Sequence, residues 1–149
     1  MTTVRQMKMA DISRVCEIAA QAWTNSTYRP IEPDVPTFAR FLKDAIVNRH
    51  AVAFVAVIND RVEGVIVGYI YPWYFSKSSF AAERFFLVSE DGKGAGARLL
   101  FRFLSWAKAH DKVNVIHLVA SAGTPNQERV ERLYGRLGKR VGSIFHIEV

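Results

Sequence analysis

The stretch that decides the fold reads Phe85-Phe86-Leu87-Val88-Ser89-Glu90-Asp91-Gly92-Lys93-Gly94-Ala95-Gly96-Ala97-Arg98-Leu99-Leu100. Its apolar first part predicts a strand, and its last part predicts the start of an amphipathic helix. Three glycines in five residues allow the backbone between them to approach a ligand closely. The first turn of a helix offers free N–H groups and a partial positive charge. The stretch therefore predicts an anion site, with phosphate as the first candidate.

Composition and length predict one globular domain over residues 1–149, because half of the residues are apolar and 23% are charged. The net charge of +6 favours polyanionic partners, among which nucleic acid and a phosphorylated cofactor are both candidates. No apolar run reaches the ~18 residues that a membrane span needs, and residues 1–10 lack the order of a signal peptide. We therefore expect a cytoplasmic protein with no membrane association.

The single cysteine, Cys16, rules out an intramolecular disulfide and a cysteine-based metal site. It falls on an expected helix face, which favours apolar packing over a role as nucleophile. The three histidines at positions 50, 110 and 146 show no metal-ligand spacing with acidic residues. No metal site is predicted.

The first half of the chain predicts a strand, two helices and a hairpin. Asp11 is expected to cap a helix that reaches about residue 25, and Asp34 with Pro36 to open a second helix that reaches about residue 48. The link Asn59-Asp60 predicts a tight turn between two antiparallel strands. The expected strands cover residues 3–8, 51–58 and 61–71. An aromatic link at residues 72–79 then either packs a strand end or lines a substrate site.

The second half predicts alternating strands and helices around the glycine-rich stretch. Residues 82–89 read as a central strand with both faces covered, and a parallel crossover leads through a helix to a strand at residues 113–119. Thr124-Pro125-Asn126-Gln127 resembles a capping box with proline at the first helical position. The helix that follows is expected to bury Val130, Leu133, Tyr134 and Leu137 and to end at Gly138.

A last strand is expected over residues 139–149. Ile144 and Ile147 are its candidates for burial.

Two known phosphate-binding motifs match the glycine-rich stretch only in part. The spacing matches the dinucleotide fingerprint G-x-G-x-x-G/A, but that fold needs further strand–helix repeats and an acidic residue at the end of the next strand, which here ends Val119-Ala120-Ser121. A Walker loop needs Lys followed by Ser or Thr, where this chain has Ala97-Arg98. A glycine-rich turn without a ligand stays open as a third interpretation.

The order of elements along essentially the whole chain resembles the GCN5-related N-acetyltransferase (GNAT) family, and more loosely its small phage and prophage members. The family's loop Arg/Gln-x-x-Gly-x-Gly/Ala aligns with residues 91–96, where Asp91 replaces the usual Arg or Gln. Residues 133–138 are similar to the family's Leu-Tyr-x-x-x-Gly-Phe segment, where Lys139 replaces the phenylalanine. The resemblance implies an α/β (α+β) fold, a single domain with a mixed central sheet flanked by about four helices.

The resemblance also implies acetyl-CoA as co-substrate and an amine of a small molecule or a peptide as acceptor. Acetyl-CoA is expected to contact Leu87, Val88, Gly92, Lys93, Gly94, Ala95, Gly96, Ala97, Arg98 and Asn126, the last of which lies one residue further from the tyrosine than in the family pattern. Tyr134 is the candidate general acid. Glu83 is the first candidate general base and His117 the second.

The alternative to an enzyme is a GNAT-like module that binds coenzyme A or a protein without turnover. A nucleic-acid-binding domain is disfavoured, because the sequence carries no recognition helix or RNA-binding aromatic motif. A homodimer stays open.

Overall fold

The computed structural model describes the chain apart from residues 27, 29 and 122–125. The chain divides into two compact units, Met1–His117 and Leu118–Val149. Each unit is described by itself.

A five-stranded mixed sheet forms the centre of the first unit. Its strands are β1 (Thr2–Gln6), β2 (Ala51–Ile58), β3 (Arg61–Pro72), β4 (Ser79–Val88) and β5 (Val113–His117). They lie in the order β1-β2-β3-β4-β5, and every neighbouring pair is antiparallel except β4 and β5, which are parallel. The mixed sheet confirms the predicted fold class.

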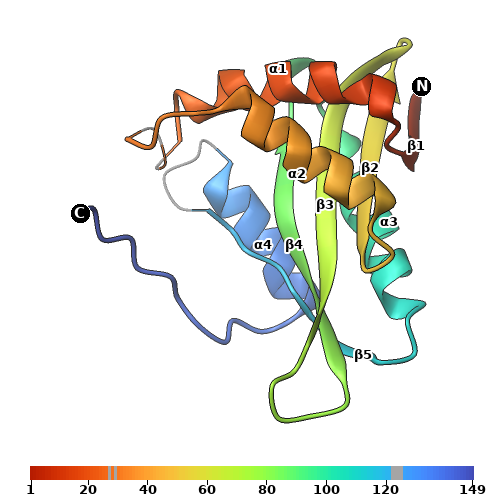
Figure 1. Ribbon diagram of the computed structural model, residues 1–149, viewed down its shortest axis with the longest axis vertical. Helices are drawn as coiled ribbons and strands as arrows, with labels where there is room; N and C mark the ends of the chain where they lie inside the picture. The colour runs from red at the N-terminus through yellow and green to blue at the C-terminus, as the bar shows by residue number, and fades with distance from the viewer. Residues whose placement is uncertain (27, 29, 122–125) are drawn as a thin grey trace. The chain divides into compact units, whose positions relative to one another are not determined.

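Helices cover both faces of this sheet (Figure 1). α1 (Ile12–Trp23) and α2 (Val35–Val47) pack on one face, where Val15 and Leu42 join a fully buried core with Val65 of β3. α3 (Ala95–Lys108) covers the other face, and its Phe103 lies directly over Gly68 of β3. The segment from β4 through α3 to β5 confirms the predicted strand, helix and parallel strand. The first unit thus has three layers, with helices on either side of the sheet, because each helix must bury one apolar stripe.

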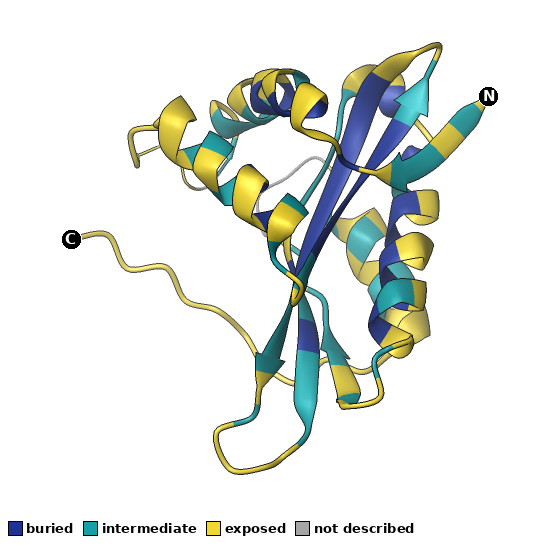
Figure 2. Ribbon diagram, turned by 45° about the vertical axis from the view of Figure 1, so that its right-hand side comes forward, coloured by how far each residue is buried: buried dark blue, intermediate teal, exposed yellow. Residues whose placement is uncertain are grey.

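The strand with the longest run of buried residues is β3, in the middle of the sheet (Figure 2). The prediction that the strand before the glycines is central was wrong, because β4 lies one place from the edge and most of its residues are half-buried. An apolar run indicates that a strand packs on both faces, but it does not give the strand's place in the sheet.

Of the two helix caps and one tight turn predicted in the first half of the chain, one cap and the turn are confirmed. Asp34 accepts a hydrogen bond from the backbone N–H of Thr37 at 2.9 Å, and Asn59 and Asp60 have positive φ angles of 50° and 61°, as a two-residue hairpin turn requires. Asp11 stands at the N-cap of α1, at the end of a short 3₁₀ turn, Met9–Asp11, but its side chain makes no cap hydrogen bond to that helix. Its carboxylate accepts from the backbone N–H of Lys8 at 2.7 Å.

The second unit contains α4 (Gln127–Leu137) and an extended segment, residues 139–149. The prediction of a last strand was wrong, because residues 139–149 form no strand, and Ile144 and Ile147 are 78% and 80% exposed instead of buried. A strand forms only where a neighbouring strand takes up its backbone hydrogen bonds. Apolar residues alone do not provide that neighbour.

α4 also departs from its prediction. It begins at Gln127 with Asn126 as its N-cap, and the predicted capping residues Thr124 and Pro125 lie outside the described residues. None of its residues is buried, and the expected stripe is half-buried at Val130, Leu133 and Tyr134 and exposed at Leu137. The helix ends before Gly138, as predicted.

Candidate functional site

The predicted anion site is a tight turn between β4 and α3, which we call the glycine turn (residues 89–96). A 3₁₀ turn, Glu90–Gly92, leaves the strand, and α3 begins at Ala95 with Gly94 as its N-cap. Gly94 has a φ angle of +88°, and its side-chain-free backbone lets the chain turn into the helix in this left-handed conformation. The first amides of α3 have no partner in their own helix, so they can bind an anion.

The three glycines of the turn differ in how strictly the fold requires a glycine at that position. A Cβ at Gly92 would lie 2.6 Å from the Glu63 carbonyl oxygen and 2.6 Å from Cγ1 of Val88, so the turn packs too closely for a side chain there. A Cβ at Gly96 would have its nearest neighbours at 3.6 and 3.7 Å, which is ordinary contact. The fold therefore needs Gly92 and Gly94. A Cβ at Gly96 would contact the side chains of Val88 and Phe86 of β4, so the fold itself does not require a glycine there.

The strand that leads into the glycine turn has an open edge. β5 pairs with β4 only from Ser79 to Ala82, and the last pair joins Ala82 to His117. From Glu83 to Val88, no described strand pairs with β4 on this side, although β3 pairs with it on the other. Ser89 donates to Glu63 of β3, so by the alternation of an antiparallel pair the backbone groups of Leu87 also face β3 and those of Val88 face the open edge. The N–H and C=O of Val88 can therefore bond an extended ligand that ends at the turn.

A β-bulge at Arg84 marks the point where this edge opens. Glu83 lies opposite Gly68 of β3 and Phe85 lies opposite Val67, so Arg84 is the extra residue. Without the bulge, Glu83 and Phe85 would lie on the same face. Phe85 instead contacts Phe38 of α2, with ring centroids 5.0 Å apart, while Glu83 shares the face of Gly68, which α3 covers.

The two candidate bases consequently lie on opposite faces of the sheet. Glu83 is 9% exposed on the α3 side. His117 pairs with Ala82, which pairs with Tyr69, and the ring of Tyr69 contacts Phe41 of α2. Because directly paired residues share a face, His117 lies on the α2 side. Both residues lie where β5 stops pairing with β4.

One aromatic residue of the link before β4, Trp73, and one of β4, Phe80, contact His117. Trp73 packs on Phe80 with centroids 4.7 Å apart, and His117 contacts both rings, at 6.1 and 5.0 Å. Tyr74 and Phe75 are exposed. Of the two interpretations of this link, packing of a strand end holds for Trp73.

Charged side chains near the turn are directed to neighbouring elements. Arg98 donates to the carbonyl oxygen of Thr2 in β1 at 3.2 Å, so its side chain binds protein while its backbone amide belongs to the first turn of α3. Asp91, the departure from the family loop, lines a hollow of about 350 Å³ at the β2–β3 hairpin. It shares this hollow with Arg61 and Glu63.

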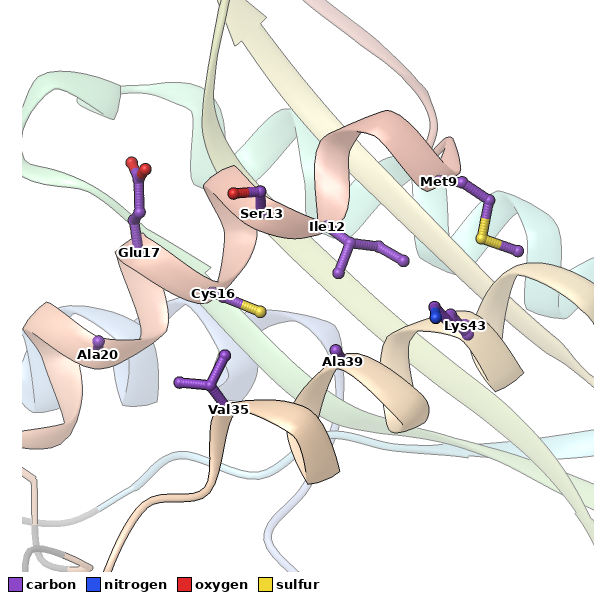
Figure 3. A pocket seen from close by; sticks show the side chains of 9 residues that line it. All are labelled: Met9, Ile12, Ser13, Cys16, Glu17, Ala20, Val35, Ala39 and Lys43. Atoms are coloured by element: carbon purple, nitrogen blue, oxygen red, sulfur yellow. The ribbon is translucent and has the colours of Figure 1, made fainter.

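Another hollow, of about 550 Å³, lies between α1 and α2 (Figure 3). None of its lining residues belongs to β4 or the glycine turn; they are Met9, Ile12, Ser13, Cys16, Glu17, Ala20, Val35, Ala39 and Lys43. Cys16 is buried, and burial raises the pKa of its thiol, which agrees with apolar packing and not with a nucleophile.

Two of the predicted site residues belong to the second unit. Tyr134 is half-buried on α4, and Asn126 is exposed at the N-cap of that helix. Within the described part of the chain, no group of three or more His, Cys, Asp or Glu side chains could hold a metal ion. No described helix is both long and apolar enough to span a bilayer.

A family model described as "Acetyltransferase (GNAT) family" matches residues 13–138. The chain belongs to the GNAT acetyltransferase family. Members of this family transfer an acetyl group, and acetyl-CoA is the acyl donor. The family confirms the resemblance drawn from the order of elements and the glycine turn.

Solved GNAT structures share the fold over nearly the full chain. An acetyltransferase from Clostridium acetobutylicum, solved with acetyl-CoA, is 20% identical with a TM-score of 0.73, and the match covers 99% of this chain and 96% of that one. A ribosomal-protein-alanine N-acetyltransferase from Brucella melitensis is 16% identical, with a TM-score of 0.71 and coverage of 100% and 99%. An aminoglycoside acetyltransferase from an uncultured soil sample is 17% identical, with a TM-score of 0.70 and coverage of 100% and 97%.

No curated protein matches the GNAT chain in sequence. At these identities, the solved structures establish the shared fold and leave the acceptor to be argued from the site.

One group of residues at the glycine turn escaped the sequence analysis. Glu63 of β3 is 3% exposed and bonds both Arg14 of α1 and Ser89 at the start of the turn. The signal was present as an acidic residue inside the apolar strand segment Val62-Glu63-Gly64-Val65-Ile66. Its partners could not be read from the sequence, because they lie 49 and 26 positions away.

Proposed function

We propose that this GNAT enzyme transfers the acetyl group to an amine of a small molecule or a peptide, by direct attack of the amine on the thioester, in the cytoplasm. The observation that carries the proposal is the open edge of β4 beside the N-terminal amides of α3, which begins at Ala95 directly after the turn. An extended chain with a phosphate at one end fits this pair of features. Acetyl-CoA supplies the acetyl group as a thioester at the other end.

The residues proposed to hold acetyl-CoA form one continuous stretch in the first unit. Leu87 and Val88 are proposed to lie along the extended arm, and the backbone groups of Val88 pair with it in the manner of an added strand. The glycine turn and the first turn of α3 hold the phosphates through backbone amides; the residues are Gly92, Lys93, Gly94, Ala95, Gly96, Ala97 and Arg98. Asn126 is proposed as an additional contact from the second unit.

Proton removal from the acceptor is the first chemical requirement, because an amine with a pKa near 10 is mostly protonated at neutral pH. Glu83 is proposed as general base and His117 as the second candidate. Glu83 and His117 lie on opposite faces of the sheet. Whichever of them acts as the base therefore identifies the face from which the acceptor amine approaches.

Tyr134 is proposed to assist the departing thiolate. A tyrosine with a pKa of about 10 is a weaker acid than a thiol of about 8.5, so full proton transfer would be uphill by about 2 kcal/mol. A hydrogen bond from the hydroxyl is therefore the favoured role. Tyr134→Phe is expected to lower turnover about a hundredfold, and unchanged turnover would remove Tyr134 from the mechanism.

Two measurements test the proposal. Isothermal titration calorimetry with acetyl-CoA is expected to show binding at one site, and release of free thiol is expected with at least one amine of a panel. The panel includes an alanine-terminated peptide and an aminoglycoside, the acceptors named for two of the similar structures. Binding without thiol release from any amine would favour a module without turnover, and no binding would refute the proposed site.

The pH dependence of kcat/KM for Glu83→Gln and His117→Ala then identifies the base. The variant that loses the acidic limb of the profile marks it. Retention of that limb in both variants would reject both residues.

A further inference from the structure

We propose that Glu63 is a positioning residue that fixes the glycine turn for acetyl-CoA, with Arg14 and Ser89 as its partners. The proposal rests on the proposed role of the turn in acetyl-CoA binding. It assigns a function to a buried charged group that the reaction itself does not use.

Glu63 contacts the turn through both its backbone and its side chain. Its carbonyl oxygen accepts from the backbone N–H of Ser89 at 2.8 Å, and its carboxylate accepts from the Ser89 hydroxyl. The backbone N–H of Gly92 donates to the carbonyl of Ser89 at 3.0 Å, and Gly92 packs against the Glu63 carbonyl. Glu63 therefore fixes the first four residues of the turn, immediately before the amides proposed to bind phosphate.

Arg14 fixes the Glu63 carboxylate from the side of α1. Its Nη2 donates to Oε2 of Glu63 at 3.0 Å, and its Nε donates to the carbonyl of Val62 at 3.1 Å. Arg61 adds a longer contact, with Nε 3.5 Å from Oε1 of Glu63. Two cations and a hydroxyl thus surround one buried carboxylate, and three elements of the fold meet there.

The Glu63 carboxylate stays ionised in this environment. Burial acts to raise its pKa, but the hydrogen bonds from Ser89 and Arg14 and the charges of Arg14 and Arg61 outweigh that effect and hold the pKa below its usual value. A buried charge with fixed hydrogen bonds has one favoured geometry. It therefore suits the role of an anchor for a turn whose amides must point at a ligand.

The chain offers a matched control for this network. Arg14 also donates to Glu17 through Nη1 at 3.0 Å, the same distance as to Glu63, but Glu17 is exposed and does not touch the turn. Glu17→Gln removes a charged partner of Arg14 and leaves Glu63 and Ser89 intact. Ser89→Ala removes the hydroxyl and leaves the Arg14–Glu63 pair intact.

The experiment compares Glu63→Gln, Ser89→Ala and Glu17→Gln by calorimetry with coenzyme A, by steady-state kinetics, and by hydrogen–deuterium exchange of residues 89–98. Glu63→Gln and Ser89→Ala are expected to raise the Kd for coenzyme A about tenfold, the loss typical of one hydrogen bond to a charged group. They should speed amide exchange in the turn and change kcat at saturating acetyl-CoA by less than about twofold. Glu17→Gln should match the wild type in all three.

Two results would overturn the proposal. One is wild-type Kd and wild-type turn exchange in folded Glu63→Gln and Ser89→Ala. The other is an equal loss of affinity in Glu17→Gln. If Glu63→Gln fails to fold, Ser89→Ala decides, because it keeps the buried ion pair.

Failure of the proposed function gives a different result. If the wild type does not bind coenzyme A, the acetyl-CoA site is wrong. Exchange of the turn amides in Ser89→Ala then still tells whether Glu63 fixes the turn.

Discussion

The sequence predicts an anion-binding turn at the glycine turn and a last strand at residues 139–149, yet only the turn has the predicted kind of structure. The turn packs against β3 so closely that Gly92 has no space for a Cβ. In the C-terminal segment, Val141, Ile144, Phe145 and Ile147 are all at least 75% exposed. Both segments carry the residue types that their predicted structures need. They differ in packing: the glycine turn contacts β3, whereas the apolar side chains of residues 139–149 are exposed.

The difference teaches which sequence signals are sufficient by themselves. A glycine-rich turn before a helix can be recognised within a few residues, because glycine readily adopts the positive φ angle that such a turn needs. A strand depends on a neighbouring strand, which is a property of the whole sheet. Local signals therefore predicted the turn, and the same kind of reasoning failed at residues 139–149.

The largest expected contrast comes from replacing one isoleucine of β3, the strand against which the glycine turn packs, and one of the C-terminal segment. Ile66 in β3 is fully buried and Ile147 is 80% exposed. Ile66→Ala is expected to lower the free energy of unfolding by about 2–5 kcal/mol, through lost burial and the cavity that remains. Ile147→Ala is expected to change it by less than about 0.5 kcal/mol. Urea unfolding followed by circular dichroism measures both, and a loss above about 1 kcal/mol at Ile147 would mean that the C-terminal segment is buried in solution.

A glycine pair sharpens the comparison further. Gly92→Ala places a Cβ 2.6 Å from a backbone oxygen and is expected to cost about 1–3 kcal/mol, as overpacking does. Gly135→Ala, inside α4, has nothing within 4 Å of its Cβ and is expected to stabilise its helix by up to about 1 kcal/mol. The same unfolding experiment applies. Equal stability of the two variants would show that the glycine turn has room that the structure denies.

Much of the first unit could be predicted from the sequence. The caps at Asp34, the hairpin at Asn59 and Asp60 and the apolar stripe of α3 rest on residues a few positions apart, and all are present. The glycine turn was found in the same way. The place of β4 in the sheet was not, because its order depends on pairing with β3 and β5 and not on its own residues.

The remaining features of the site depend on contacts across the sheet. Nothing in the run of residues 81–86 reveals the bulge at Arg84, yet it decides which face Glu83 shares. The anchor at Glu63 likewise needs Arg14 and Ser89, which the fold brings together from α1 and the end of β4. Such features depend on the register of the strands, that is, on which residue of one strand lies opposite which residue of the next. The sequence pattern does not determine that register to within one residue.

Gly96→Ala separates folding from ligand binding at the turn. Because a Cβ at this position has ordinary contacts and lies in the first turn of α3, stability is expected to stay the same or rise by up to about 1 kcal/mol. The added methyl group would lie against Val88 and Phe86, beside the first-turn amides proposed to hold the phosphates, so the Kd for coenzyme A is expected to rise about tenfold, or about 1.4 kcal/mol. Calorimetry and urea unfolding on one sample give both values. Unchanged affinity would place the phosphates away from Gly96.

The smallest expected effect is a pH dependence of the first unit that the C-terminal segment should not share. Arg5 donates to both oxygens of Asp11, at 2.7 and 2.9 Å, and this pairing holds the pKa of the Asp11 carboxyl below its usual value of 3.8. Since the folded-state pKa is lowered, the pair stabilises the fold fully above about pH 4, and this contribution is lost as the pH falls through the folded-state value.

Asp11→Asn is therefore expected to cost about 1 kcal/mol at pH 7 and progressively less below pH 4. Glu148→Gln, in the exposed segment, serves as the control and should leave the free energy of unfolding unchanged at both pH values. Urea unfolding at pH 7 and at pH 3 measures the difference. A cost for Asp11→Asn that stays constant with pH would assign the effect to packing instead of charge, because only the ionised carboxylate gains from Arg5.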